Sequence, residues 1–250
     1  MKINPPFGYS EIVVLNKTQR VALQKAGVAP TFCKSLNAIP LSYSEFPRAS
    51  RDYPLVFISG DSGKTFGAVA VTGLQAAQNL FIDSKGEWDP GVYLPAYVRR
   101  YPFCMAKIKV DNVARSERVV CVEQSALDEK NGQSMFNDKG EPLPLWTQTE
   151  KLLREYEADL MRSEEMCDIL NSYGLLEPFS MQAALNAGGA MHLTGMHRVN
   201  EAKLETLKAE QCRNLIRKGV MGRLYAHLIS LDNFARLLDR NVAHQKTDDR

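Results

Sequence analysis

The stretch YPLVFISGDSGKTFGAVAV, residues 53–71, holds two short apolar runs that are separated by a glycine-containing turn. Each run has the length of a strand and is bounded by turn residues, which predicts a hairpin with strands at Leu55–Ile58 and Gly67–Val71. Similar runs predict further strands at Leu80–Ile82, Cys104–Ile108 and Arg118–Val122. The short spacings between the runs favour antiparallel meanders over strand-helix-strand units.

The second half of the chain has helical periodicity instead. Apolar residues recur at helical spacing over 148–172 and predict a long amphipathic helix. Thr147, with Glu150 three residues later, is typical of a capping box at the start of this helix. Gly174 predicts a left-handed residue that ends it.

Shorter elements are predicted after this helix. Residues 181–194 indicate a hairpin with its turn at 186–189. Asn200 is expected to cap a short helix, and Gly219 to end a second one. The apolar face over 220–238 predicts a third helix.

Strands that precede a cluster of late helices predict an α+β fold. We expect a mainly antiparallel sheet from residues 53–125 and 181–195, covered by the long central helix and by the C-terminal helices. One domain is expected to span all 250 residues, with residues 1–50 wrapping the core and forming a short helix at Gln19–Ala26. Residues 240–250 are polar and are expected to be flexible.

The composition argues against several classes of partner. Lys and Arg number 31 against 29 Asp and Glu, so the net charge of +2 creates no general attraction for nucleic acid. No apolar stretch approaches the ~18 residues of a membrane span, and two early prolines interrupt the segment where a signal peptide needs an apolar core. Five scattered cysteines without C-x-x-C spacing predict reduced thiols, mostly in the core. We therefore expect a cytoplasmic protein.

The sequence contains stretches similar to known catalytic and cofactor-binding motifs, but their spacing or the order of their residues does not match those motifs. Gly60–Thr65 is similar to a phosphate-binding loop, but only two residues separate its glycines and a strand is predicted to follow. The Gly-Asp-Ser-Gly within it is similar to a serine-protease nucleophile loop, yet the first histidine, His192, comes after that serine. The four histidines have no metal-binding spacing. No catalytic residue, metal or cofactor is therefore predicted.

The densest group of candidate side chains is WDPGVYLPAYVRRYPF, residues 88–103, with five aromatics, three prolines and two adjacent arginines. Rigid aromatic surfaces beside a guanidinium suit a carboxylate, a phosphate or a peptide. The candidate ligand-binding residues in this block are Trp88, Tyr93, Tyr97, Arg99, Arg100 and Tyr101. The alternative is structural, with core aromatics and with arginines that satisfy carbonyls or helix ends.

The two arginines are expected to differ. Pro95 and Pro102 favour extended residues just before them, so an extended backbone is predicted over 97–101. Alternation along a strand then places Arg99 and Arg100 on opposite faces. One is predicted to be buried against an acidic group or carbonyls, and the other to reach solvent or a pocket.

His227 lies at the edge of the apolar stripe of the last predicted helix, which indicates a half-buried ring. The ring either bonds a backbone carbonyl and packs on the sheet, or contacts a ligand. Ser230, about 60° away around the helix, is a better partner for a ligand site than Tyr225, about 160° away.

Much of the chain resembles the SapC family of bacterial proteins, which is distinct from the peptide-transporter permease of the same name. The stretches that carry the resemblance are residues 35–57, 79–103, 121–142 and 195–238. The resemblance extends from about residue 30 to 238 and implies one compact unit. The family is named after a surface-layer-associated protein, and it supplies no established catalytic residues.

These observations leave several functional hypotheses open. The first is a non-catalytic cytoplasmic accessory protein that binds a small molecule, a peptide or a protein partner in a pocket formed by the aromatic and arginine block and the helix of His227 and Ser230. The second is a surface-layer component or a secretion helper. The third is an enzyme around Arg99, Arg100 and His227, because histidine titrates near neutral pH and arginine can hold an anion. Tyr225 and Glu45 are further candidates for that enzyme site.

Overall fold

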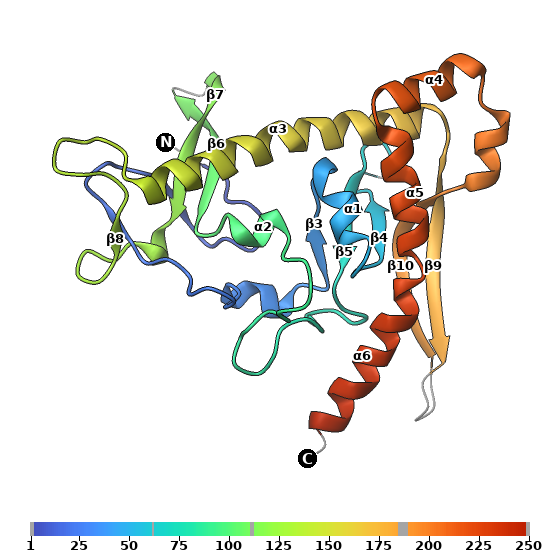
Figure 1. Cartoon of the computed structure of the whole chain (residues 1–250), viewed down its shortest axis with the longest axis horizontal. Helices are drawn as coiled ribbons and strands as arrows, with labels where there is room; N and C mark the ends of the chain where they lie inside the picture. Colours follow the sequence, from blue (N-terminus) through green and yellow to red (C-terminus); the bar gives the residue numbers. More distant parts are fainter. Residues whose placement is uncertain (1–2, 62, 111–112, 185–189, 249–250) are drawn as a thin grey trace.

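The computed structural model describes residues 3–61, 63–110, 113–184 and 190–248 (Figure 1). In these residues the strands pair antiparallel in sheets of order β1-β7-β6, β3-β5-β4-β10-β9 and β2-β8. The strands are β1 (Ile12–Val14), β2 (Arg20–Val21), β3 (Ala38–Pro40), β4 (Leu55–Ile58), β5 (Gly67–Val71), β6 (Phe103–Val110), β7 (Val113–Glu123), β8 (Gln133–Ser134), β9 (Leu176–Ala184) and β10 (Ala190–Val199).

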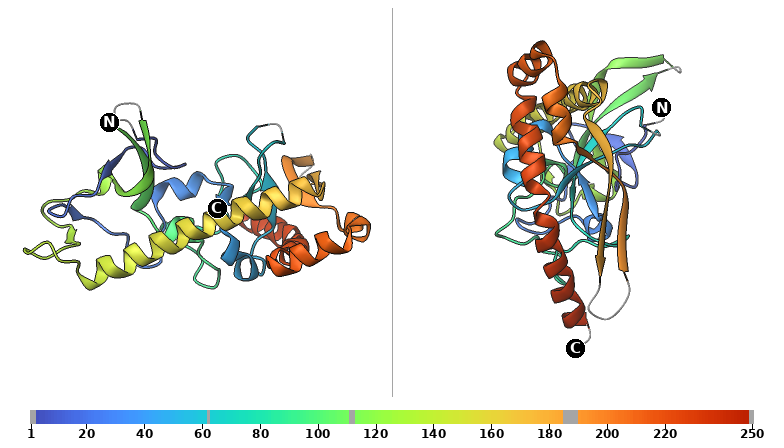
Figure 2. Two further views of the ribbon diagram at one scale, coloured as in Figure 1. Left: turned by 90° about the horizontal axis from the view of Figure 1, so that it is seen from above. Right: turned by 90° about the vertical axis from the view of Figure 1, so that its right-hand side faces the viewer.

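The longest helix, α3 (Pro144–Ser172), runs along the molecule from the three-stranded sheet to the five-stranded sheet (Figures 1 and 2). Helix α5 (Val220–Ser230) packs on β4 and β10 of the five-stranded sheet. The other α-helices are α1 (Phe46–Ala49), α2 (Ala96–Arg99), α4 (Ala209–Arg217), α5 (Val220–Ser230) and α6 (Asn233–Asp248). Short 3-10 helices are η1 (Thr31–Ser35), η2 (Tyr43–Glu45), η3 (Gln124–Ala126) and η4 (Glu201–Thr206). Among the described residues, no helix combines the length and the apolar character that a bilayer span requires.

Helix α3 connects two hydrophobic cores. Near its start, Trp146 and Leu153 pack in a core that includes Phe103 of β6. Further along, Tyr156 and Leu170 belong to the larger core under the five-stranded sheet. One continuous apolar stripe therefore holds both sheets against the same helix, which is the arrangement that its periodicity predicts.

The α+β fold is confirmed, although the strands belong to separate sheets rather than one. Residues 72–102, between β5 and β6, contain Pro90, Pro95 and Pro102, and proline cannot donate to a sheet ladder. The chain leaves the five-stranded sheet there and forms a new sheet from β6 onward. The predicted strand at Leu80–Ile82, which lies in this segment, is wrong. Of these three residues, Ile82 forms an isolated bridge with Trp88.

The N-terminal segment contributes to every sheet named above. It supplies β1, β2 and β3, which pair with β7, β8 and β5. The predicted helix at Gln19–Ala26 is wrong, because Arg20–Val21 forms β2. Arg20 Nε also donates to the carbonyl of Gly132 at 2.9 Å. A helix of this length is marginal on its own, so long-range pairing prevails over it.

Helix α3 begins earlier than its capping pattern predicts. Pro144 occupies its first turn and Leu143 is the N-cap, so the capping box at Thr147 is wrong. Proline suits the first helical position because it has no amide hydrogen to leave unpaired. Thr147 Oγ1 donates to the Leu143 carbonyl at 3.3 Å. The left-handed stop is confirmed, since Gly174 has φ of 66°.

The C-terminal helices follow the predicted order with two differences. The Asn200 side chain caps η4 as predicted, and Gly219 (φ 69°) separates α4 from α5. The predicted helix over 220–238 is divided at 231–232, and the side-chain Nδ2 of Asn233, the first residue of α6, donates to the Ser50 carbonyl at 2.8 Å. Helix α6 then continues to Asp248, beyond the predicted helix end at 238. The hairpin β9–β10 is confirmed, whereas its predicted turn, 186–189, lies outside the described residues.

Most of the cysteines are core residues, as predicted. All five are free, and four of them are buried. Burial raises the pKa of Cys33, Cys104 and Cys167 to about 12, and that of Cys121 to about 11. These thiols therefore carry almost no thiolate at neutral pH and are poor nucleophiles.

Candidate functional site

The arginine pair lies at the end of a short helix and not on a strand. Helix α2 starts directly after Pro95, which is its N-cap (ψ 145°), so the predicted extended backbone over 97–101 is wrong. A proline restricts the residue before it and leaves the residue after it free to enter a helix. The separation of the pair is nevertheless confirmed, because successive helical residues point about 100° apart. Arg99 is exposed, whereas Arg100 is 5% exposed.

Arg100 is enclosed by tyrosine rings between α2 and α3. Its guanidinium carbon lies 4.4 Å from the ring centroid of Tyr97 and 4.8 Å from that of Tyr156. Its Nη1 lies 3.9 Å from Glu157 Oε1, and Glu157 also pairs with Arg118. Burial raises the pKa of Glu157, while the two arginines oppose that rise. In the described residues, the buried Nε of Arg100 has no hydrogen-bond partner.

Glu45 in η2 is a buried carboxylate that organises the other side of α2. Its Oε1 accepts from the Ala96 amide at 2.6 Å and from the Tyr93 hydroxyl at 3.0 Å. Its Oε2 accepts from the Ser42 amide at 2.8 Å. Arg99 Nη2 in turn donates to the Tyr93 oxygen at 3.2 Å. Burial, reinforced by the charge of Glu45, raises the pKa of Tyr93 to about 12, so its hydroxyl keeps its proton at neutral pH.

A second buried carboxylate, Asp159 of α3, adjoins this network. Its Oδ2 accepts from the Ser44 amide at 2.7 Å and from the Ser44 hydroxyl at 2.5 Å. Ser42 Oγ lies 2.9 Å from the same oxygen and 2.7 Å from Glu45 Oε2. Since a hydroxyl carries one proton, Ser42 donates to one carboxylate at a time. Within the described ranges, no three His, Cys, Asp or Glu side chains gather as a metal ion would require.

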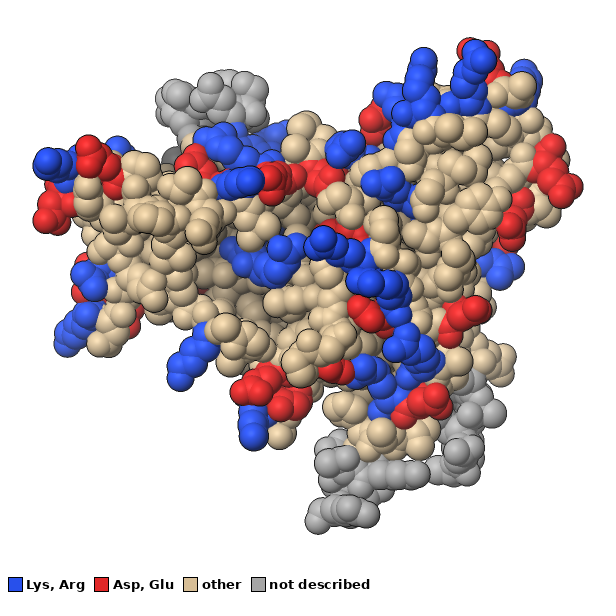
Figure 3. Space-filling model, in the orientation of Figure 1, with Lys and Arg blue, Asp and Glu red and all other residues tan. Residues whose placement is uncertain are grey.

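A hollow of about 350 Å³ opens beside this network, and we call it the polar hollow. Arg48 and Arg99 line it together with Tyr93 and Ser44. Arg99 donates from its Nε to the Leu94 carbonyl at 3.0 Å, and its Nη1 has no partner among the described residues. No hydrogen bond or ion pair engages the Arg48 side chain in the part of the chain that the structure describes. Figure 3 shows a band of basic side chains across the middle of the molecule, with acidic side chains beside it.

A second hollow of about 260 Å³, the apolar hollow, lies between residues 23–30 and helices α2 and α3. Arg99 and Leu152 line both hollows, so the two adjoin at these side chains. Arg100 and Tyr101 also line the apolar hollow. The structure therefore gathers four sequence-predicted candidates around α2: Tyr93 and Arg99 at the polar hollow, and Arg99, Arg100 and Tyr101 at the apolar hollow.

Tyr97 belongs to the core rather than to either hollow. It is 4% exposed, its hydroxyl donates to the Phe7 carbonyl, and its ring packs on Arg100. Tyr101 has a mixed position, because its ring centroid also lies 5.3 Å from that of Tyr9.

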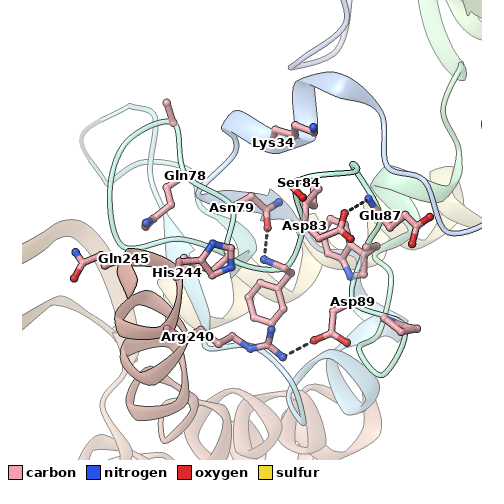
Figure 4. Close-up of a pocket in the computed structure, with 17 residues that line it drawn as sticks. Lys34, Gln78, Asn79, Asp83, Ser84, Glu87, Asp89, Arg240, His244 and Gln245 are labelled. Atoms are coloured by element: carbon pink, nitrogen blue, oxygen red, sulfur yellow. Dashed lines mark hydrogen bonds and ion pairs between the residues drawn. The ribbon is translucent and has the colours of Figure 1, made fainter. Parts of the chain in front are cut away.

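Trp88 lies apart from both hollows. It is 4% exposed, and its Nε1 donates to the Tyr53 hydroxyl at 3.2 Å. It lines a separate cavity of about 800 Å³ between the loop that follows β5 and helix α6 (Figure 4). There Arg240 lies 4.4 Å from the Phe81 ring centroid and pairs with Asp89 at 2.7 Å. This cavity is lined by side chains of both charges and has no single electrostatic preference.

His227 and Ser230 join α5 to the five-stranded sheet. The predicted half-buried ring is wrong: His227 is 0% exposed. Its Nε2 accepts from the Val199 amide at 3.0 Å, so its Nδ1 carries the proton that is donated to the Leu55 carbonyl at 2.8 Å. Ser230 Oγ accepts from the Leu55 amide at 2.9 Å. Burial lowers the pKa of His227 to about 4. Neither residue lines the two hollows.

The sequence analysis did not assign Ser42, Ser44, Arg48 or Asp159 to a site. Two signals could have indicated them. Ser42 and Glu45 have the S-x-x-E spacing that precedes a helix. Asp159 interrupts the apolar stripe of α3, where a charged residue is buried only if it has partners. Arg48 has no sequence signal, because an arginine in the last turn of a short helix is ordinary.

The fold and the hollows define an α+β protein with two adjoining hollows around α2, one lined by side chains of both charges and the other by apolar and basic side chains. The SapC family model matches residues 17–237, and the chain belongs to the SapC family. Neither the curated proteins nor the solved structures contain a match to the chain.

Proposed function

We propose that this protein binds an anionic ligand in the polar hollow, with the anionic group between Arg48 and Arg99. The proposal is carried by a difference between the acidic and the basic side chains that line the hollow: two of the acids have hydrogen-bond partners, and one of the arginines has none. Glu45 and Asp159 already accept hydrogen bonds from the protein, whereas Arg48 has no partner in the described residues. An anion would supply the acceptors that the guanidinium groups lack.

The third carboxylate of the hollow does not oppose this binding. Glu155 is 65% exposed, and its Oε1 lies 3.9 Å from Lys151 Nζ. Water and the neighbouring ammonium screen its charge, so its repulsion of a bound anion is weak.

Arg99 is already positioned for binding. It is held by the Leu94 carbonyl and the Tyr93 hydroxyl, and its guanidinium carbon lies 5.8 Å from the Tyr93 ring centroid. A side chain that is held before binding loses less conformational entropy when the ligand arrives. The planar guanidinium matches the geometry of carboxylate and phosphate oxygens. These features support a carboxylate or phosphate group, on a small molecule or a peptide.

The proposed role is that of a non-catalytic accessory protein in the cytoplasm. The five free cysteines support this location, because thiols persist in a reducing compartment and tend to form disulfides outside it.

Alanine at Arg48 or at Arg99 is expected to weaken anion binding about tenfold or more, since a hydrogen bond to a charged group is worth ~1.5–3 kcal/mol. The measurement is isothermal titration with sulfate and with citrate at constant ionic strength. Double replacement is expected to abolish the heat of binding.

Arg154→Ala is the matched control. Arg154 is 68% exposed on α3, pairs with Glu150, and lines neither hollow. Arg154→Ala removes one positive charge, as the two test variants do, but leaves the hollow unchanged. Equal affinities in all variants, or no anion binding by the unmodified protein, would contradict the proposed function.

A further inference from the structure

The apolar hollow has an apolar and basic lining that the proposed anion site does not use. Most of its wall is apolar, and the apolar lining residues include Leu23, Val28, Pro30, Leu94, Val98, Phe103 and Leu152. Its charged lining residues are Lys25, Arg99 and Arg100, and no Asp or Glu is among the described residues that line it. An apolar wall with cations and no acid is complementary to an apolar molecule that carries a negative charge.

Arg100 adds a buried guanidinium to this wall. Its side chain is 5% exposed and its Nε has no acceptor in the described residues. Buried donors without partners are uncommon in folded proteins, because each one costs the free energy of its lost hydration. Glu157 faces the guanidinium only from the Nη1 side, at 3.9 Å, and the Nε is sealed from solvent, so the Arg100 charge adds to the positive character of this wall.

The two hollows adjoin at Arg99 and Leu152. The apolar hollow, at about 260 Å³, is small for a ligand site on its own, and the polar hollow, at about 350 Å³, lies at the lower end of the ~300–1,000 Å³ range of such sites. Together they lie well within that range. The apolar hollow has room for roughly nine groups at the ~30 Å³ that a water molecule occupies in the liquid. That capacity corresponds to a medium-length hydrocarbon chain.

From this arrangement we infer that the ligand is an amphipathic monocarboxylate of medium length. Its carboxylate lies at Arg99, and its hydrocarbon body lies in the apolar hollow along Leu152. This inference rests on the proposed function and adds the class of ligand to it.

The test uses decanoate as the probe in isothermal titration, with acetate and decanol as comparisons. Decanoate is expected to bind at least about a hundredfold more tightly than acetate, because each buried methylene contributes ~0.8 kcal/mol. Decanol, which lacks the charge, is expected to bind at least about tenfold more weakly than decanoate. Decanoate that binds no better than acetate, or decanol that binds as well as decanoate, would overturn the inference.

A variant of α3 tests the location of the chain. Thr149 lines the apolar hollow, and Thr149→Phe is expected to fill it and weaken decanoate binding about tenfold or more while sulfate binding is retained. Thr147→Phe is the control, because Thr147 is exposed on the same helix and lines neither hollow. If Thr149→Phe does not fold, Leu23→Glu places a negative charge in the same wall and is expected to have the same effect. Unchanged decanoate affinity in a folded variant would overturn the inference.

Sulfate separates the two possible failures. If sulfate binds through Arg48 and Arg99 but decanoate has no advantage over acetate, the ligand class is wrong and the anion site stands. If neither sulfate nor citrate binds the unmodified protein, the proposed function fails and the ligand class fails with it.

Discussion

Between pH 7 and pH 4 the protein is expected to lose on the order of 3 kcal/mol of stability through His227 alone. Burial lowers the pKa of this ring from 6.5 to about 4 in the folded protein. The unfolded chain therefore binds a proton near pH 6.5, whereas the folded protein resists it until about pH 4. The stabilisation is fully present above pH 6.5 and is lost as the pH falls through this interval.

The structural reason is that His227 uses both nitrogens on backbone groups. A protonated ring could no longer accept the amide of Val199, which lies 3.0 Å from its Nε2. Protonation would thus break the bond that joins α5 to β10 and place a charge in the core.

Urea unfolding across pH 4 to 7 provides the measurement, with His227→Gln as the test variant. Glutamine does not titrate, so the variant is expected to be less stable than the wild type at pH 7 but to lose less stability on acidification. His192→Gln is the control, since His192 is exposed on β10. Parallel pH profiles for the wild type and His227→Gln would contradict the buried neutral ring. NMR titration of the His227 ring gives the same answer without a variant, because its shifts are expected to stay constant down to about pH 5.

The elements that the sequence predicts well are those with a clear local pattern of apolar residues or a local stop signal. Helix α3 follows from its apolar periodicity, strands β4 and β5 follow from short apolar runs between turn residues, and Gly174 ends α3 as predicted. Periodicity reports burial on one face, and that face is decided within the element itself. How the strands are divided among sheets depends on long-range pairing, which periodicity does not contain.

The candidate site was predicted only in part, for a physical reason. The block 88–103 does contain Tyr93, Arg99 and Arg100, but the side chains that give Arg99 its surroundings come from distant segments. Glu45 lies 51 residues before the Ala96 amide that it accepts, and Asp159 lies 115 residues after Ser44. No local pattern records such contacts. The α2 helix was also missed, because the restriction that Pro95 places on Leu94 was extended to the residues that follow.

Arg100→Ala is expected to lower the free energy of unfolding by about 2–4 kcal/mol. The substitution removes a guanidinium that lies between the rings of Tyr97 and Tyr156, and it leaves a cavity in their place. It also withdraws one of the two arginines that face Glu157, a carboxylate whose pKa burial already raises. The loss of stability is limited because the Nε of Arg100 has no hydrogen-bond partner among the described residues. The free-energy cost of its burial disappears when the side chain is removed.

Arg99→Ala is the matched comparison, since it removes the same side chain from the neighbouring position of the same helix. Arg99 is exposed and bonds to the half-buried Leu94 and Tyr93, so its loss is expected to change stability by less than about 1 kcal/mol. Chemical unfolding of the two variants side by side gives both values. Sulfate titration then separates the roles further, because Arg99→Ala is expected to weaken binding while it leaves stability nearly unchanged. Equal and small losses of stability in the two variants would show that Arg100 contributes no more to the core than a surface arginine, and would reject its place between the tyrosine rings.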